Sequence, residues 1–305
     1  MQQHWPKLSY EKAKDTYHTI HLWTQIVGKI KVQQLPWINH SWHVTLSVTP
    51  TGLTSGYIPS ANKYFKIDFD FLNHKLLLTT SDNEDYSFSL ESLSVAACYN
   101  QLLDTLNGCG IACDIHPRPN ELEDATPFRH DNHDVYDKQH ASDLHKALVN
   151  VNHVLTEFRA EFIGKCSPVH FFWGSFDLAV SRFSGREAPL HPGGFPNLPD
   201  WITQEAYSHE VSSCGFWPGS PSAPYAAFYS YIYPEPDGYP KAEVQPAASR
   251  YDEDLGESIL PYEDVRVSKN PSQTLLHFLR STYDAAAELA DWDREALHRK
   301  ENYGG

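Results

Sequence analysis

The side chains best suited to chemistry lie close together in the second half of the chain, between positions 170 and 210. They are imidazoles, carboxylates and one guanidinium: His170, Asp177, Arg182, His191, Glu205, His209 and Glu210. Such groups transfer protons, hold anions or bind divalent metal ions, according to how a fold places them. Because turns rich in glycine and proline surround them, we expect loops to bring all seven side chains to one concave site.

Four of the seven predict a metal site. Glu205 and His209 are four positions apart, so one helical turn would place both on the same face, with Glu210 and His191 as further ligands. Zn, Mn and non-haem Fe accept such imidazole and carboxylate ligands, so a divalent metal ion is the candidate cofactor. The chain has no HExxH or HxH pattern, and the alternative is that these histidines hydrogen-bond to loop carbonyls.

His170, Asp177 and Arg182 are the predicted catalytic residues. In the stretch 176–182 apolar side chains alternate with Asp177, so a strand would turn Asp177 away from the main packing face or into a cavity. Arg182 has the opposite parity and would need a bulge or twist to join Asp177, although its planar guanidinium suits a carboxylate or phosphate. The simpler alternative is an exposed acid and an arginine at the end of a strand.

His170 is also a candidate base for a nucleophilic Cys166. An extended segment would separate these two side chains by roughly 13 Å, and a small buried thiol is the commoner role of a lone cysteine. A run of aromatic residues, Tyr225, Phe228, Tyr229, Tyr231 and Tyr233, is suited to stacking on a planar ligand. Its simpler interpretation is the core of a sheet.

The spacing of apolar residues predicts the elements that position these groups. Helices are predicted at 10–33, 95–108, 144–162 and 271–290, where apolar residues recur every three or four positions. Strands are predicted at 42–48, 65–71, 76–78, 86–90, 169–173, 176–182, 211–217 and 226–233. The predicted class is α+β, with two pseudo-repeated lobes that each contain a long helix, an antiparallel sheet of three to five strands and a closing helix.

The composition changes at 117–140, a segment rich in acids and prolines that we predict to be a linker. It separates an N-terminal lobe, 1–116, from a C-terminal lobe, 141–305. The matched order of elements suggests a fused duplication in which residues 41–46 correspond to 175–180. Loop-like stretches at 184–208 and 234–262 mark the C-terminal lobe as the one that carries function.

Three blocks of sequence resemble an uncharacterised bacterial family, a domain of unknown function. They are HLWTQIVGKI at 21–30, KCSPVHFFWGSFDLA at 165–179 and SHEVSSCGFWPG at 208–219. The resemblance extends from about Trp5 to Asp293 and implies a bacterial protein. It implies no reaction, cofactor or catalytic residue.

Composition excludes some classes of protein. The 24 lysines and arginines stand against 39 acids, a net charge of −15, which argues against nucleic acid as a partner. No apolar stretch is long enough for a membrane-spanning helix. The five cysteines contain no CxxC pair, which argues against a disulfide framework and favours a cytoplasmic protein.

Two functions fit these features. One is an enzyme that acts on a small molecule through the predicted His and carboxylate groups, with or without a metal ion. The other is a non-catalytic protein that binds a small ligand or forms a homo-oligomer through its aromatic surfaces.

Overall fold

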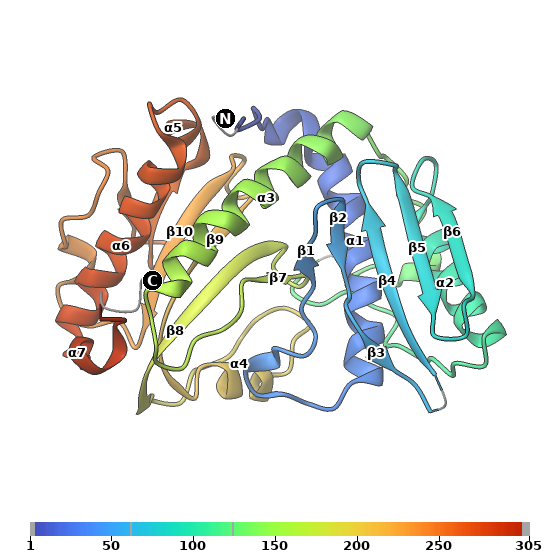
Figure 1. The fold of residues 1–305 in the computed structure, drawn as a ribbon, viewed down its shortest axis with the longest axis horizontal. Helices are drawn as coiled ribbons and strands as arrows, with labels where there is room; N and C mark the ends of the chain where they lie inside the picture. The colour runs from blue at the N-terminus through green and yellow to red at the C-terminus, as the bar shows by residue number, and fades with distance from the viewer. Residues whose placement is uncertain (1–3, 62, 124, 301–305) are drawn as a thin grey trace.

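Two antiparallel sheets, one in each half of the chain, form the framework of the protein, whose structure is a computed structural model (Figure 1). The structure describes residues 4–61, 63–123 and 125–300. The other positions of the predicted lobes and linker, 1–3, 62, 124 and 301–305, lie outside the described residues. The predicted α+β class with two lobes is confirmed. Each sheet has six strands among the described residues, more than the three to five predicted.

The first lobe is a sheet covered by two helices. Its elements are α1 (Tyr10–Gln34), the 3-10 helix η1 (Asn39–Ser41), β1 (Ser47–Val48), β2 (Gly52–Thr54), β3 (Ile58–Pro59), β4 (Tyr64–Asp70), β5 (Lys75–Thr80), β6 (Asp85–Ser89) and α2 (Val95–Gly108). The strand order is β1-β2-β4-β5-β6, and β3 also pairs with β4. Phe65, Ile67 and Phe69 are buried, which confirms the alternation predicted for β4. Figure 1 shows α1 and α2 behind this sheet.

The second lobe contains the longest strands of the described structure, β8 and β9, whose bounds follow. Its elements are α3 (Lys138–Ala160), β7 (His170–Phe172), β8 (Asp177–Glu187), α4 (Asp200–Ala206), β9 (His209–Trp217), β10 (Ala227–Tyr233), η3 (Tyr239–Lys241), β11 (Arg250–Asp252), β12 (Glu257–Pro261), α5 (Tyr262–Arg266), α6 (Pro271–Leu289) and α7 (Arg294–Leu297). The preceding 3-10 helix η2 (Phe128–His130) packs against α2 of the first lobe. The strand order is β11-β12-β10-β9-β8-β7. Helices α3 and α6 cover one face of this sheet, so its other face is available to form a site (Figure 1).

Local sequence explains where the three later long helices begin. The Ser94 hydroxyl accepts a hydrogen bond from the Ala97 amide at 3.1 Å, and the Asp137 carboxylate accepts one from the His140 amide at 2.8 Å. Asn270 caps α6, whose first residue is proline. Each cap satisfies an amide that has no partner within the helix, which fixes the first turn.

The two lobes meet along α1 and at one β-bridge. The backbones of Leu46 and Phe171 exchange two hydrogen bonds of 2.9 Å, which join the β1 side of one sheet to β7 of the other. Helix α1 is buried on most sides, including Lys29 and Lys31, because both lobes pack against it. One continuous apolar core therefore contains residues of both lobes. The domain boundaries at 117 and 140 stay a prediction.

The predicted correspondence between 41–46 and 175–180 is wrong. Residues 42–46 form a turn and an isolated bridge, and β1 lies at the edge of its sheet, whereas β8 lies between β7 and β9. The predicted strand at 42–48 is reduced to Ser47–Val48, because the chain turns at its start: Trp42 has helical backbone angles, and the Val44 amide donates to the Ser41 carbonyl at 3.2 Å. The two lobes share an order of elements but not this alignment.

The stretches predicted to be loops contain structure that matters for the site. Helix α4 lies within 184–208, and strands β11 and β12 lie within 234–262. Strand β12 lies between β11 and β10 in the sheet, and it brings an acidic residue, Glu257, beside β10.

Candidate functional site

A cavity of about 860 Å³ lies on the face of the second sheet that α3 and α6 leave free. Its floor is the sheet. Its walls come from α1, from the chain segments 37–44 and 114–121, and from the segment 195–207 that includes α4. A volume of this size is typical of sites for small molecules.

Alternate residues of neighbouring strands form the floor. On β8 these include Asp177, Ala179 and Ser181, and the facing positions on the adjacent strands are Ser213, Gly215, Tyr229 and Tyr231. Gly215 lies directly between β8 and Tyr229, and a Cβ there would stand 2.6 Å from the Tyr229 hydroxyl. Because Gly215 has no side chain, the Tyr229 ring can cross β9 and reach Asp177.

Asp177 is the most distinctive group of the floor. Its side chain is 7% exposed, its Oδ2 accepts a hydrogen bond from the Tyr229 hydroxyl, and its Oδ1 has no partner among the described residues. Burial raises the pKa of Asp177 to about 7, although the Tyr229 hydrogen bond lowers it, and the nearby Glu121 adds to the rise. A carboxyl group in this state can both donate and accept a proton near neutral pH.

Two further carboxyl groups line the same cavity. Burial raises the pKa of Glu257 to about 7, and repulsion from Asp177 and Asp252 adds to the rise. Burial also raises the pKa of Glu121, whereas a 2.6 Å hydrogen bond from the Ser175 hydroxyl lowers it. The Asp177 carboxylate therefore favours the protonated form of Glu257.

Lys29 is the single lysine or arginine in the cavity lining that the described residues provide. Its ammonium donates to the Asn120 side chain, and burial lowers the pKa of Lys29 to about 8, while Glu121 opposes that shift. The segment around Asn120 is held in place by α1, because the Asn120 amide donates to Gln25 at 2.8 Å. A residue of the predicted linker thus becomes part of the cavity wall.

An indole ring forms the wall next to α1. Trp173 is buried against Gly28, and its Nε1 donates to the Val44 carbonyl at 2.8 Å. A Cβ at position 28 would overlap atoms of this ring. Glycine is required here because the ring lies directly on the helix backbone.

We expect Gly28→Ala to destabilise the protein by about 1–3 kcal/mol, since the added methyl group must displace Trp173. Alanine for glycine inside a helix normally stabilises by about 0.5–1 kcal/mol. The matched control is Gly108→Ala in α2, where a Cβ meets nothing within 4 Å. Urea unfolding of both variants measures the difference, and a Gly28→Ala variant as stable as Gly108→Ala would contradict the packing described here.

Segment 195–207 covers the cavity. Helix α4 packs against η1, where the His40 amide donates to Glu205 at 2.8 Å. At the outer edge Trp37 and Trp201 contact each other, with ring centroids 4.8 Å apart, and both are largely exposed. Side chains from two segments distant in sequence therefore form the outer edge of the cavity.

The structure does not bring the seven predicted residues together. Among them, all of which lie in the described part of the chain, Asp177 alone lines the cavity. His170 is buried beside Trp42, and burial lowers its pKa to about 4, so the imidazole is neutral. Arg182 is 2% exposed on the opposite face of the sheet, where its guanidinium stacks on Phe158. The predicted union of Asp177 and Arg182 is wrong because no bulge corrects the parity of β8 between them.

The four predicted metal ligands are also apart. Helix α4 ends at Ala206 and β9 begins at His209, so Glu205 and His209 do not share a helical face. Glu210 forms an ion pair with Arg186 at 2.7 Å, and His191 stacks on Tyr207 at 4.6 Å. Among the residues that the structure describes, no three His, Cys, Asp or Glu side chains are arranged to hold a metal ion.

Several residues of the site carried no signal in the sequence. The predicted loop contains Glu257, the predicted linker contains Glu121, and the end of the first predicted helix contains Lys29. No spacing pattern connects these three residues. Tyr229 and Tyr231 were predicted either to stack on a ligand or to form sheet core. They line the cavity, and the Tyr231 hydroxyl lies 2.7 Å from that of Tyr207.

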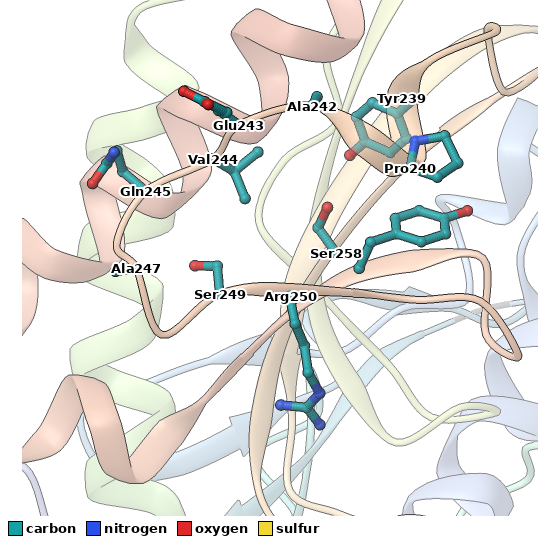
Figure 2. A pocket seen from close by; sticks show the side chains of 11 residues that line it. Tyr239, Pro240, Ala242, Glu243, Val244, Gln245, Ala247, Ser249, Arg250 and Ser258 are labelled. Atoms are coloured by element: carbon teal, nitrogen blue, oxygen red, sulfur yellow. The ribbon is translucent and has the colours of Figure 1, made fainter.

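A second, smaller hollow of about 320 Å³ lies between η3 and β11 (Figure 2). Figure 2 shows Val244, Ser249 and Ser258 near one another across it, whereas Arg250 extends away. The Arg250 guanidinium donates to the Tyr225 hydroxyl at 2.6 Å. This hollow lacks the buried carboxyl groups that distinguish the larger cavity.

Fold and cavity together define an α+β protein with two antiparallel sheets and a concave site lined by acidic and aromatic residues. No helix in the described part of the chain has the length and apolar character needed to cross a membrane. The chain belongs to a family of unknown function, DUF5996, whose model matches residues 5–299. No curated protein and no solved structure matches it.

Proposed function

We propose that the protein is an enzyme that converts a small molecule by proton transfer, with Asp177 as the general acid–base group. The observation that carries this proposal is the state of Asp177: it lines the cavity, it is buried, and one carboxylate oxygen is anchored by Tyr229 while the other is buried without a hydrogen-bond partner among the described residues. General acid–base catalysis is most efficient when the pKa of the group lies near the working pH, and burial brings the pKa of Asp177 to about 7.

Each residue of the site has a distinct part in this reaction. The Tyr229 hydroxyl holds Oδ2 of Asp177, so Oδ1 is the atom that gives a proton to the substrate or takes one from it. Glu257 is the second carboxyl, and it exchanges a proton at another substrate atom. The aromatic walls and segment 195–207 surround a bound substrate on several sides, and the displacement of water by that substrate strengthens electrostatic interactions inside the cavity. No step needs a metal ion.

Binding without chemistry is the competing function, and a comparison of variants separates the two. Purified wild-type protein, Asp177→Asn and Glu210→Gln are incubated with a deproteinised cell extract, and the compounds are followed by mass spectrometry. Glu210 lies outside the cavity lining and serves as the control.

We expect wild type and Glu210→Gln to consume the same compound. Asp177→Asn should consume it at least about 100-fold more slowly, since a positioned acid–base group contributes about 10²–10⁴-fold. The wild-type rate should change with pH around 7. Identical compound profiles in all three samples, together with a compound that remains bound and unaltered, would establish a binding protein instead. Dimerisation, cytoplasmic location and the absence of nucleic-acid partners stay predictions.

A further inference from the structure

The charges around the cavity are unbalanced. Its lining contains four acids, Asp114, Glu121, Asp177 and Glu257, against the one lysine, Lys29. Lys29 and Glu121 attract each other, so these two offset one another. The charged groups that raise the pKa of the other two buried acids are themselves carboxylates: Glu121 acts on Asp177, and Asp177 and Asp252 act on Glu257. Asp177 and Glu257 therefore share a region in which a positive charge is missing.

Four other titratable side chains of the lining are kept neutral. Burial lowers the pKa of His40, so its ring is neutral near pH 7. Burial raises the pKa of Tyr207, Tyr229 and Tyr231, which keeps their hydroxyls protonated. His116 lines the cavity as well, beside Asp114 in the 114–121 wall.

Aromatic rings line the same cavity as the two acids. Phe172, Trp173, Trp217, Tyr229 and Tyr231 all line the cavity. The face of an aromatic ring carries partial negative charge and attracts cations, and a desolvated site strengthens that attraction. A carboxyl group beside aromatic faces can satisfy both the charge and the N–H donors of an ammonium group, and the flat rings provide contact for an apolar body.

We infer that the cavity binds an organic cation, a protonated amine attached to a planar apolar group. The ammonium pairs with the carboxyl groups of Asp177 and Glu257, which both line the cavity, while the planar group lies between the aromatic walls. The net charge of −15 attracts such ligands from solution. This inference rests on the proposed function only in that both use the same cavity, and it names the class of substrate.

Three probes that share an indole ring with a short side chain test the inference. They are tryptamine, a cation; tryptophol, its neutral alcohol analogue; and indole-3-acetate, an anion. Binding is measured by isothermal titration calorimetry at pH 7 in two buffers of different ionisation enthalpy, which also reports protons released. We expect tryptamine to bind at least about tenfold more tightly than tryptophol, and indole-3-acetate to bind least.

Proton release distinguishes the inferred ammonium–carboxylate contact from nonspecific binding of the indole ring. A bound ammonium favours the ionised carboxyl groups, so tryptamine should release about half a proton to one proton at pH 7, according to whether one or both acids ionise, and tryptophol none. Asp177→Asn and Glu257→Gln should each reduce the preference for tryptamine over tryptophol, whereas Glu210→Gln should preserve it. Two separate variants keep the test valid if one of them fails to fold.

Equal affinity for tryptamine and tryptophol, tighter binding of indole-3-acetate, or no binding of tryptamine at about 1 mM would overturn the inference. These readouts do not depend on turnover. If tryptamine is preferred with proton release and no compound is consumed in the extract experiment, the proposed catalysis fails and the amine site stands. If a compound is consumed and it is neutral or anionic, the proposed catalysis stands and the amine site fails.

Discussion

Asp177→Asn is expected to make the protein more stable at pH 8, by an amount that disappears near pH 4. Asparagine keeps an oxygen to accept the Tyr229 hydrogen bond and removes the charge that burial opposes. The pKa of Asp177 rises from 3.8 to about 7 on folding, and each unit corresponds to about 1.4 kcal/mol. The stabilisation should therefore approach about 4 kcal/mol above pH 7.

The direction follows from proton binding. Between pH 4 and 7 the folded protein retains a proton at Asp177 that the unfolded chain has lost, so the stability of wild type falls as pH rises through this range. In Asp177→Asn this contribution is absent. The free energy of unfolding, measured by urea denaturation at several pH values, should diverge between the two proteins from pH 4 to 7 and stay parallel above.

A matched control is Asp68→Asn, the same change on the first sheet, where the carboxylate forms an ion pair with Lys66. It should shift stability by less than about 0.5 kcal/mol. A constant difference between wild type and Asp177→Asn at all pH values would show that Asp177 is not held in its protonated form.

Arg182→Ala is expected to destabilise the protein by about 2–5 kcal/mol without affecting ligand binding. The guanidinium stacks on Phe158 at 3.4 Å and on Tyr283 at 4.4 Å, and it donates to the Phe158 carbonyl near the end of α3. It thus joins β8, α3 and α6. Alanine would leave a void among these rings and remove a cation from the negative end of a helix.

Arg182→Met separates packing from charge, because methionine fills most of the volume with no charge to bury. It should lose less than about 1.5 kcal/mol, since apolar replacement of a buried charged group is often tolerated. Both variants should bind tryptamine like wild type, because Arg182 lies on the face opposite the cavity. A loss of binding in the stable Arg182→Met variant would restore a functional role to this residue.

The candidate site shows how far sequence reasoning extends. Asp177 was predicted because alternation within a single strand is a local property, and the prediction that it faces away from the packed side or into a cavity is confirmed. The predictions that placed Arg182 beside Asp177 and Glu205 beside His209 are wrong. The first required a bulge or twist in the strand, and the second required a continuous helix. Neither assumption has a local signature.

The sequence by itself determined the elements with strong periodicity. Helices α1, α2 and α6 begin and end within about one residue of their predicted positions, because a 3.6-residue apolar period, caps and helix-ending residues act within a few positions of each other. Helix α3 begins at Lys138, earlier than the predicted start at 144 and inside the predicted linker. The strands β4, β5, β8, β9 and β10 followed from alternation in the same way. The α+β class is a consequence of these elements and needed no information from distant residues.

Tertiary structure alone decided which side chains share the cavity. Lys29, Glu121, Asp177 and Glu257 come from α1, the predicted linker, β8 and β12, and more than 220 positions separate the first from the last. Their meeting depends on packing both lobes against α1 and on adding β12 to the sheet, and the free energy for both comes from the apolar core. The raised pKa of Asp177 follows from the same burial, since desolvation arises only when distant segments close over a group.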